Sequence, residues 1–341
     1  METRFNKYIS ANVLFDKSIK VLAAVSGGVD SVVLVELLKR AGMDFGIAHC
    51  NFQLRGDESE ADEAFVKRLA KDCGVAFHVK KFETGEYARK RKLSVQMAAR
   101  VLRYDWFETV RLKDDYSVIA TAHHLDDNVE TFFLNLVRGT GIRGLSGIKP
   151  KNGNVVRPLL FAKKDEIITY ASQANLTFRE DASNVEDKYN RNFIRHNVIP
   201  QLEKLNPNFV ENMQETMGRL AVCKEIYQQA ILEMKADIVE EGETVKLKIA
   251  KLNALSSLNH SLFELISKYG FTSSDVSDIA AALNGAPGKQ FFSGSHRLIK
   301  DRDYLLIVPI DRNFSEVITI EEGTTNISNP VALTFELRAR D

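Results

Sequence analysis

The sequence predicts an α/β protein, with a doubly wound parallel sheet up to about residue 208 and a second, smaller, mainly helical α+β domain after it. Two observations predict this. Short apolar runs alternate with helical patterns in the first part, and the pattern changes to one long helix and shorter mixed elements after Pro207. Strands that alternate with helices form parallel sheets that are covered on both faces. We expect domains at 1–208 and 209–310, and at 311–341 a linker or the start of a truncated C-terminal domain.

The strands and helices follow from these patterns in chain order. The strands of the first domain are expected at Val21–Val25, Phe45–His49, Val75–Val79 and Ser117–Thr121. The helices between them are expected at Ser31–Arg40, Glu58–Asp72 and Ser94–Leu112. In the second domain, helices are expected at Phe209–Lys235, Leu258–Tyr269 and Ser273–Leu283, and strands at Thr244–Ile249, Lys289–Phe292 and Tyr304–Val308.

Composition excludes several classes of protein. The chain is 44% hydrophobic and 27% charged, which is typical of a globular domain, and no apolar run reaches the length of a membrane span. The start METRFNKYIS lacks the apolar core of a signal peptide, so we expect a cytoplasmic protein. The three cysteines form no C-x-x-C pair, which argues against a disulfide framework, a cysteine-rich zinc site or a cysteine-held iron–sulfur cluster.

The net charge is zero, but the charges are unevenly distributed. The stretch from His78 to Lys113 contains ten Lys or Arg residues and four acids. A local excess of positive charge can attract a polyanion even when the whole chain is neutral. The run Arg89–Lys92 either faces such a partner or is an ordinary solvated surface.

The motif SGGVDS, from Ser26 to Ser31, joins the first strand to the first long helix. We expect Gly27 and Gly28 to take positive φ, so that the backbone N–H groups and the helix N-terminus can hold an anion. The two serines can donate to phosphate oxygens, and Asp30 would repel phosphates unless Mg²⁺ lay between them. The alternative is a plain turn in which Asp30 caps the helix.

This motif is not a Walker loop, because no lysine follows the glycines. It resembles the pyrophosphate loop (PP-loop) of the N-type ATP pyrophosphatases, which have a Rossmann-like sheet and split ATP between its α- and β-phosphates. The resemblance implies an AMP-forming enzyme with ATP as substrate and Mg²⁺ as cofactor. ATP binding is then expected at Ser26, Gly27, Gly28, Val29, Asp30 and Ser31.

A second glycine-rich stretch, GTGIRG (Gly139–Gly144), fits the dinucleotide-binding pattern G-x-G-x-x-G. A true instance follows a strand and begins a helix. Here the preceding ETFFLNLVR reads as a helix, so we interpret the stretch as a loop near the active site.

Four further segments narrow the family. They are HCNFQLRGDESEAD (His49–Asp62), AARVLRYDWF (Ala98–Phe107), TAHHLDDNVETFFLNLVRGTGIRGLSGI (Thr121–Ile148) and EDASNVEDKYNRNFIRHNVIPQLEKLNP (Glu180–Pro207). With the loop motif they resemble the tRNA(Ile)-lysidine synthase family over roughly Val21–Pro207. The resemblance implies a ligase that uses ATP and free L-lysine to modify the first anticodon cytidine of a tRNA(Ile) with a CAU anticodon. Cys50-Asn51-Phe52 departs from the more polar stretch expected of the family.

The segment HHLDDNVET follows the fourth strand and should face the same crevice as the phosphate loop. We therefore expect Asp30 and Asp127 to act as metal ligands and catalytic carboxylates, with His123 as an accompanying polar contact. The alternative is that Asp126 or Asp127 only caps the next helix, with Glu130 in its first turn. A general base is also needed, and His123, His124 and Asp127 are equal candidates.

Six arginines are expected to contact the tRNA, because RNA loops are held by Arg and Lys at the phosphates. They are Arg100, Arg103, Arg138, Arg143, Arg191 and Arg195. Trp106 and Phe107 have helical spacing with other apolar residues and should pack in the core.

Two other functions remain open at this point. A PP-loop tRNA thiolase would need paired cysteines or a cluster, and a non-catalytic, nucleotide-gated RNA-binding protein would not need Asp30 beside the phosphates. The sequence does not determine the oligomeric state, and a homodimer is one option.

Overall fold

The computed structural model describes residues 1–179, 190–310, 324–327 and 333–334. The segment expected at 311–341 and the first part of Glu180–Pro207 therefore lie largely outside the described residues. The chain forms two compact units, Met1–Ile226 and Tyr227–Asp341. The boundary between them falls inside helix α11 (Phe209–Ile238), whereas the sequence pattern favoured a boundary just before this helix.

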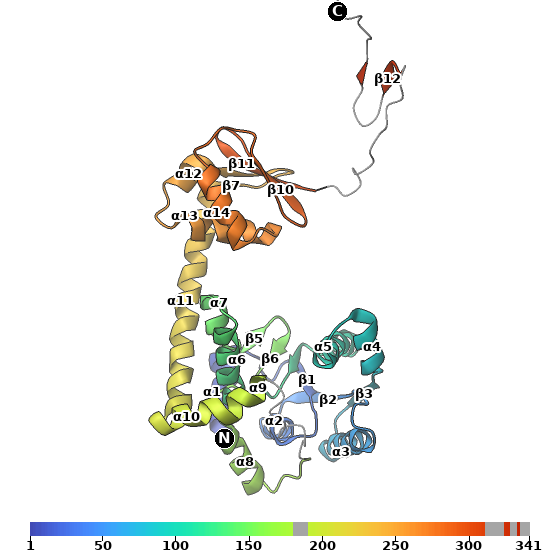
Figure 1. Cartoon of the computed structure of the whole chain (residues 1–341). Helices are drawn as coiled ribbons and strands as arrows, with labels where there is room; N and C mark the ends of the chain where they lie inside the picture. The colour runs from blue at the N-terminus through green and yellow to red at the C-terminus, as the bar shows by residue number, and fades with distance from the viewer. Residues whose placement is uncertain (180–189, 311–323, 328–332, 335–341) are drawn as a thin grey trace, which may run out of the picture. The chain divides into compact units, whose positions relative to one another are not determined.

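The first unit contains a six-stranded sheet of order β3-β2-β1-β4-β6-β5 (Figure 1). Neighbouring strands from β3 to β6 are parallel, and β5 pairs antiparallel with β6 at the edge. The expected doubly wound sheet is confirmed. The strands are β1 (Lys20–Ala24), β2 (Asp44–Asn51), β3 (Phe77–Lys81), β4 (Val118–Ala120), β5 (Lys151–Asn152) and β6 (Val155–Val156).

The long helices begin and end close to the expected residues. Those of the first unit are α1 (Glu2–Ala11), α2 (Val29–Arg40), α3 (Asp57–Cys73), α4 (Thr84–Arg91), α5 (Val95–Lys113), α6 (Leu125–Val137), α7 (Ile142–Leu145), α8 (Lys164–Gln173), α9 (Asn190–Phe193) and α10 (Ile199–Leu205), with a π-helical turn at Ile194–Val198. No helix in the described part of the chain is both long and apolar enough to cross a membrane.

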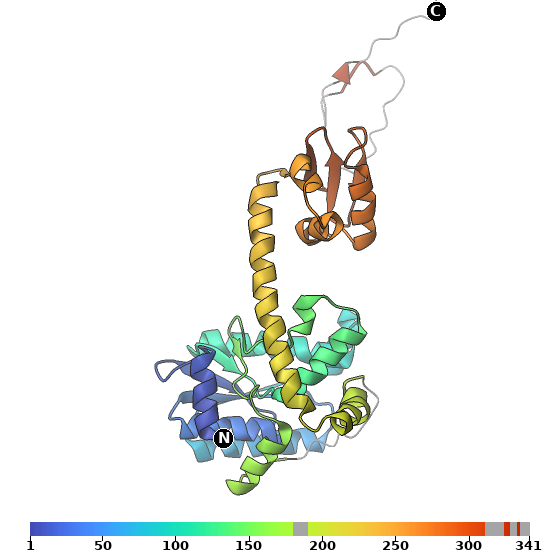
Figure 2. The ribbon, with the colours of Figure 1, turned by 90° about the vertical axis from the view of Figure 1, so that its left-hand side faces the viewer.

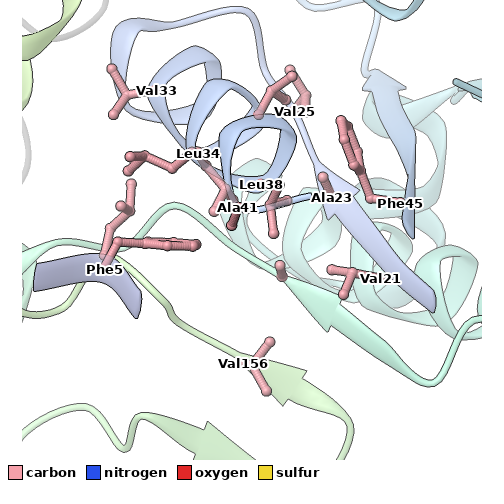
Figure 3. Close-up of a cluster of buried hydrophobic side chains, with 14 of the residues drawn as sticks. Phe5, Val21, Ala23, Val25, Val33, Leu34, Leu38, Ala41, Phe45 and Val156 are labelled. Carbon is pink, nitrogen blue, oxygen red and sulfur yellow. The ribbon is translucent and has the colours of Figure 1, made fainter. Parts of the chain in front are cut away.

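Both faces of the sheet are covered, as the near-continuous apolar strands require. Val21 and Ala23 of β1 belong to the core formed with α1, α2 and α8, part of which is drawn in Figure 3. Leu22 points to the opposite face and belongs to the core of Trp106 and Phe107 on α5. The expected core position of these two aromatic residues is confirmed.

The strand order determines where the ligand crevice forms. β1 lies between β2 and β4, so the chain leaves β1 toward one edge of the sheet and later returns to its other side at β4. In open α/β sheets the crevice forms beyond the carboxyl ends of the strands at this switch point. The segments that follow β1 and β4 should therefore face each other.

The second unit contains a five-stranded antiparallel sheet of order β7-β8-β11-β10-β9, with α12, α13 and α14. The elements are β7 (Val239–Glu240), β8 (Val245–Lys248), α12 (Ile249–Asn253), α13 (Leu258–Ile266), α14 (Ser273–Ala282), β9 (Gln290–Phe292), β10 (His296–Lys300) and β11 (Tyr304–Pro309). The chain enters this unit through α11, the long helix coloured yellow in Figure 2. The expected α+β character is confirmed, although the sequence pattern did not predict β7, β10 or α12.

Candidate active site

The SGGVDS loop lies between β1 and α2, as expected. Gly27 has a φ of 101°, a conformation that favours glycine. Gly28 has a φ of −71° and a ψ of 162°, so the expectation of positive φ at both glycines is wrong for Gly28. As the N-cap of α2, Gly28 needs the extended backbone that begins a helix.

Hydrogen bonds inside the loop fix its shape. The Ser31 hydroxyl donates to the Gly28 carbonyl at 2.8 Å and accepts from the Gly27 N–H at 3.2 Å. Ser31 is buried, whereas Ser26 is exposed. Ser31 therefore holds the loop, and Ser26 has the more accessible hydroxyl for a ligand.

Asp30 does not cap α2, because the helix has no side-chain cap at its N-terminus. Its carboxylate lines a pocket of about 270 Å³. This pocket is the expected crevice, since residues after both β1 and β4 line it. The lining includes Ser26 and Asp30 from the loop, Thr121, His123 and Asp127 from the segment after β4, and Arg103, Tyr104 and Phe107 from α5.

His124 lies between the two carboxylates that the sequence singled out. Its Nε2 is 3.6 Å from Asp127 Oδ2 and 4.0 Å from Asp30 Oδ1, and its Nδ1 is 3.2 Å from Asp126 Oδ2. Burial by itself would lower the pKa of His124, but the hydrogen bond to Asp126 and the charges of Asp127 and Asp30 raise it overall. The surrounding carboxylates therefore favour the protonated imidazole more than in a free histidine.

His123 has the opposite character. Burial lowers its pKa to about 4, and its Nδ1 lies 2.9 Å from the Thr121 hydroxyl. At neutral pH its ring is uncharged, so it can make a polar contact in the pocket but is a weak base.

Asp126 and Asp127 do bond to helix N-termini. Asp127 Oδ2 accepts the His124 N–H at 3.0 Å in a capping box of α6, and Asp126 Oδ2 accepts the Lys164 N–H at 2.8 Å, at the start of α8. Asp127 also lines the pocket. Capping and a role in the pocket are therefore compatible for this residue.

Two arginines that were expected to contact tRNA make ion pairs with buried acids. Glu130 is fully buried, and its carboxylate accepts from Arg191 Nε at 2.6 Å and from Arg195 Nε at 2.5 Å. Arg191 also reaches Asp127 Oδ1 at 3.3 Å. These guanidinium groups neutralise the carboxylates of α6, and only part of each remains exposed.

Two residues of the site carry no motif that sequence reasoning could have recognised. Lys164 Nζ lies 2.6 Å from Asp30 Oδ1. The backbone N–H of Arg179 donates to the Gly27 carbonyl at 3.0 Å, while its guanidinium pairs with Glu58 and Asp62 of α3. Only the fold brings these residues to the loop.

The remaining predicted arginines lie at different distances from the pocket. Arg103 lines it, with its guanidinium 5.2 Å from the centre of the Phe52 ring. Arg100 is exposed on the same helix and lies over Tyr104 at 5.0 Å. Arg138 is the C-cap of α6 and Arg143 lies in α7, and neither lines the pocket.

Comparison with known proteins decides the family. Residues 1–202 match a family model described as a PP-loop domain, and residues 240–310 match one described as a TilS substrate binding domain. The chain is 44% identical over 311 residues to a tRNA(Ile)-lysidine synthase of Bacteroides thetaiotaomicron. The aligned region covers 91% of this chain and 72% of that protein. A tRNA(Ile)-lysidine synthase of Parabacteroides distasonis is 41% identical, with 96% and 75% covered. This chain belongs to the tRNA(Ile)-lysidine synthase family.

A solved structure supports the fold alone. The U34-tRNA thiolase of Methanococcus maripaludis, which was solved with its [4Fe-4S] cluster, superposes with a TM-score of 0.53 at 20% identity. The likeness covers 64% of this chain and 77% of the thiolase.

The cysteines of this lysidine synthase family member do not suit sulfur chemistry. Cys50 lies at the pocket, but burial raises the pKa of its thiol to about 12, so the reactive thiolate is disfavoured. Cys73 is partly buried, and its thiol pKa is also raised by burial, while Cys223 is exposed on α11.

The departure at Cys50-Asn51-Phe52 has a local explanation in this family member. Phe52 stacks on Phe82, with ring centres 5.6 Å apart, and lies under the Arg103 guanidinium. Asn51 donates to Glu60 and Glu63 of α3. The segment therefore forms an aromatic wall of the pocket on one side and a polar contact to α3 on the other.

The stretch Gly139–Gly144 follows helix α6 and leads into the four-residue helix α7. A dinucleotide-binding turn follows a strand, so this reading of G-x-G-x-x-G is excluded.

Proposed function

We propose that this member of the tRNA(Ile)-lysidine synthase family joins lysine to the first anticodon cytidine of tRNA(Ile). ATP first transfers AMP to the cytosine O2, with release of pyrophosphate. The ε-amine of free L-lysine then attacks the adjacent carbon, and AMP leaves. The observation that carries the proposal is the position of the SGGVDS loop, which shares one pocket with the HHLDD segment after β4.

The loop is suited to the phosphates of ATP. The first N–H groups of a helix have no partners within the helix, and those of α2 begin at the phosphate loop. Ser26 adds an exposed hydroxyl at the pocket. Negative charge develops on pyrophosphate as AMP is transferred, and fixed donors stabilise such charge most effectively in a partly enclosed site.

Asp30 and Asp127 are the residues that would hold Mg²⁺. The described residues contain no group of three metal-ligating side chains. The two carboxylates of Asp30 and Asp127 fit Mg²⁺, which is commonly held by one or two carboxylates together with substrate phosphates and water. Bound there, the ion would neutralise charge on the phosphates.

Two basic side chains of the chain itself lie beside these carboxylates. Lys164 pairs with Asp30, and His124, whose pKa is raised by the carboxylates, lies between Asp30 and Asp127. We assign to them the neutralisation of the two carboxylates, which would otherwise repel the phosphates. The second step needs a neutral amine, whereas the ε-amine of free lysine has a pKa of about 10.4. A group in the site must therefore accept a proton from it.

The two rival functions lack support. The high thiol pKa of Cys50 and the absence of a C-x-x-C pair from the sequence disfavour sulfur transfer. Pure RNA binding would gain nothing from acidic groups around the phosphate loop. We place the reaction in the cytoplasm with its tRNA substrate, and a homodimer stays a prediction.

Incorporation of labelled lysine tests the proposal. The protein is incubated with ATP, Mg²⁺, labelled lysine and tRNA(Ile) with a CAU anticodon, with a methionine tRNA that has the same anticodon letters as the control. We expect label in tRNA(Ile) only when ATP is present. Sulfur derived from cysteine entering the tRNA, with no lysine, would instead establish the thiolase.

A further inference from the structure

Helices α4 and α5 form a hairpin whose turn is fully exposed. All residues from Arg89 to Met97 are exposed, including the four consecutive cations Arg89, Lys90, Arg91 and Lys92. Three apolar side chains in the turn and the start of α5 are also exposed: Leu93 (36%), Val95 (39%) and Met97 (50%). An apolar and basic surface that nothing in the described chain covers calls for a partner.

Several cations of this hairpin have no acidic partner in the described chain. Within the described residues, Arg89, Lys92, Arg100 and Arg103 have no carboxylate at ion-pair distance. By contrast, Arg4, Arg40, Arg179 and Arg195 each pair with at least one carboxylate. Lys90 is paired with Glu86, so its charge is less available to an anionic partner than those of its neighbours.

The helix dipole explains only part of the pattern. Basic residues in the last turn of α4 stabilise that helix by interacting with its C-terminal carbonyl groups. That explanation does not apply to Arg100 and Arg103, which lie in the first half of α5. It also gives no reason for the exposed apolar side chains.

The cations without acidic partners extend along α5 to the active-site pocket. Arg103 lines the pocket, and Arg100 lies one helical turn before it on α5. From Val95 to Arg103 the helix rises about 12 Å. The cations of α5 thus connect the pocket to the turn that contains Arg89 and Lys92.

We propose that this surface, defined by Arg89, Lys92, Leu93, Val95, Arg100 and Arg103, holds the phosphates of the RNA strand next to the base in the pocket. The partner is RNA because its charge complements the unpaired cations and because Arg103 already reaches the pocket. The apolar side chains would contact unstacked bases or sugars of a single-stranded loop. The proposal rests on the proposed function for the identity of the RNA.

The test measures binding of tRNA(Ile) with a CAU anticodon as a function of KCl concentration, without lysine. Its result is therefore readable even if lysine incorporation fails. The variant Arg89→Ala/Lys92→Ala should raise Kd about five- to tenfold at moderate salt, and should reduce the salt slope by about 1.5. Arg89→Lys/Lys92→Arg keeps both charges and should keep the slope.

Lys67→Ala/Arg68→Ala is the matched control. These two residues are exposed on α3, and within the described chain they also lack a carboxylate at ion-pair distance. This variant loses the same charges, and its slope should stay close to that of the wild type. Equal Kd values and slopes for the two alanine variants would overturn the proposal and leave the surface to a protein partner.

Discussion

The ammonium group of Lys164 lies 2.6 Å from a carboxylate oxygen of Asp30, and the two residues are 134 positions apart in the chain. Asp30 is the second residue of α2 and Lys164 is the first residue of α8, and these two helices pack on the same face of the sheet. The ion pair therefore joins the phosphate loop to a helix whose own first residues have no recognisable motif.

Replacing Lys164 by Met should raise the KM for ATP about tenfold, because Asp30 of the phosphate loop would lose the cation that pairs with it and would repel the phosphates more strongly. Lys163→Met is the control. Lys163 is the next residue, and it pairs with Glu211 in a half-exposed contact that is not part of the pocket. Steady-state kinetics of pyrophosphate release would measure both. Equal KM values for the two variants would remove Lys164 from the site.

Arg179 should matter through the position of the loop. Its backbone holds Gly27, and its side chain is held by Glu58 and Asp62. Arg179→Ala would release the side chain, so we expect the KM for ATP to rise several-fold with a smaller change in kcat. Arg179→Lys should restore part of the effect. A loss of kcat at unchanged KM would indicate a role in the chemical step instead.

Arg195 should contribute to stability more than to RNA binding. Its removal would leave buried Glu130 with only one of its two guanidinium partners. An under-compensated buried acid costs about 1–3 kcal/mol. Arg195→Ala should lower the free energy of unfolding in urea by that amount.

The Arg195 experiment has a clear opposite outcome. Wild-type stability together with a smaller salt slope of tRNA binding would return Arg195 to the RNA interface. Arg219→Ala is a suitable control, since Arg219 makes only an exposed pair with Glu215.

His123 should make the fold less stable in acid. Its folded pKa of about 4 lies below the ordinary histidine value of 6.5, so the unfolded chain binds the proton more tightly. Stability is fully present above pH 6.5 and is lost as the pH falls from there toward 4. His123→Gln should lose less stability across this window, as measured by urea unfolding at several pH values. Parallel curves for the two proteins would contradict the neutral, buried state of His123.

The sequence predicted the parts of the site that are local. SGGVDS specifies a turn and a helix start within six residues, and strand order alone brings HHLDD to the same crevice. The side chain of Val29, a residue expected in the ATP-binding loop, is buried in the core, and Val29 is the first residue of α2.

The non-local parts could not be predicted. The spacing of Arg191 and Arg195 places them on one helical face, but nothing in that spacing says that the face meets Glu130 of α6. Likewise, nothing in the sequence distinguishes Lys164 from the other lysines, because its contact with Asp30 depends on α8 packing beside α2. Strands β5 and β6 are two residues long, too short to show an apolar pattern.

The identity of the spent nucleotide tests the central claim most directly. ATP labelled at the α-phosphate is supplied with Mg²⁺, lysine and tRNA(Ile), and the labelled products are separated. If the loop after β1 holds the triphosphate for adenylate transfer, AMP accumulates in step with pyrophosphate and incorporated lysine. Asp30→Ala should yield none of the three products while melting at the same temperature as the wild type. Labelled ADP as the product would contradict the account.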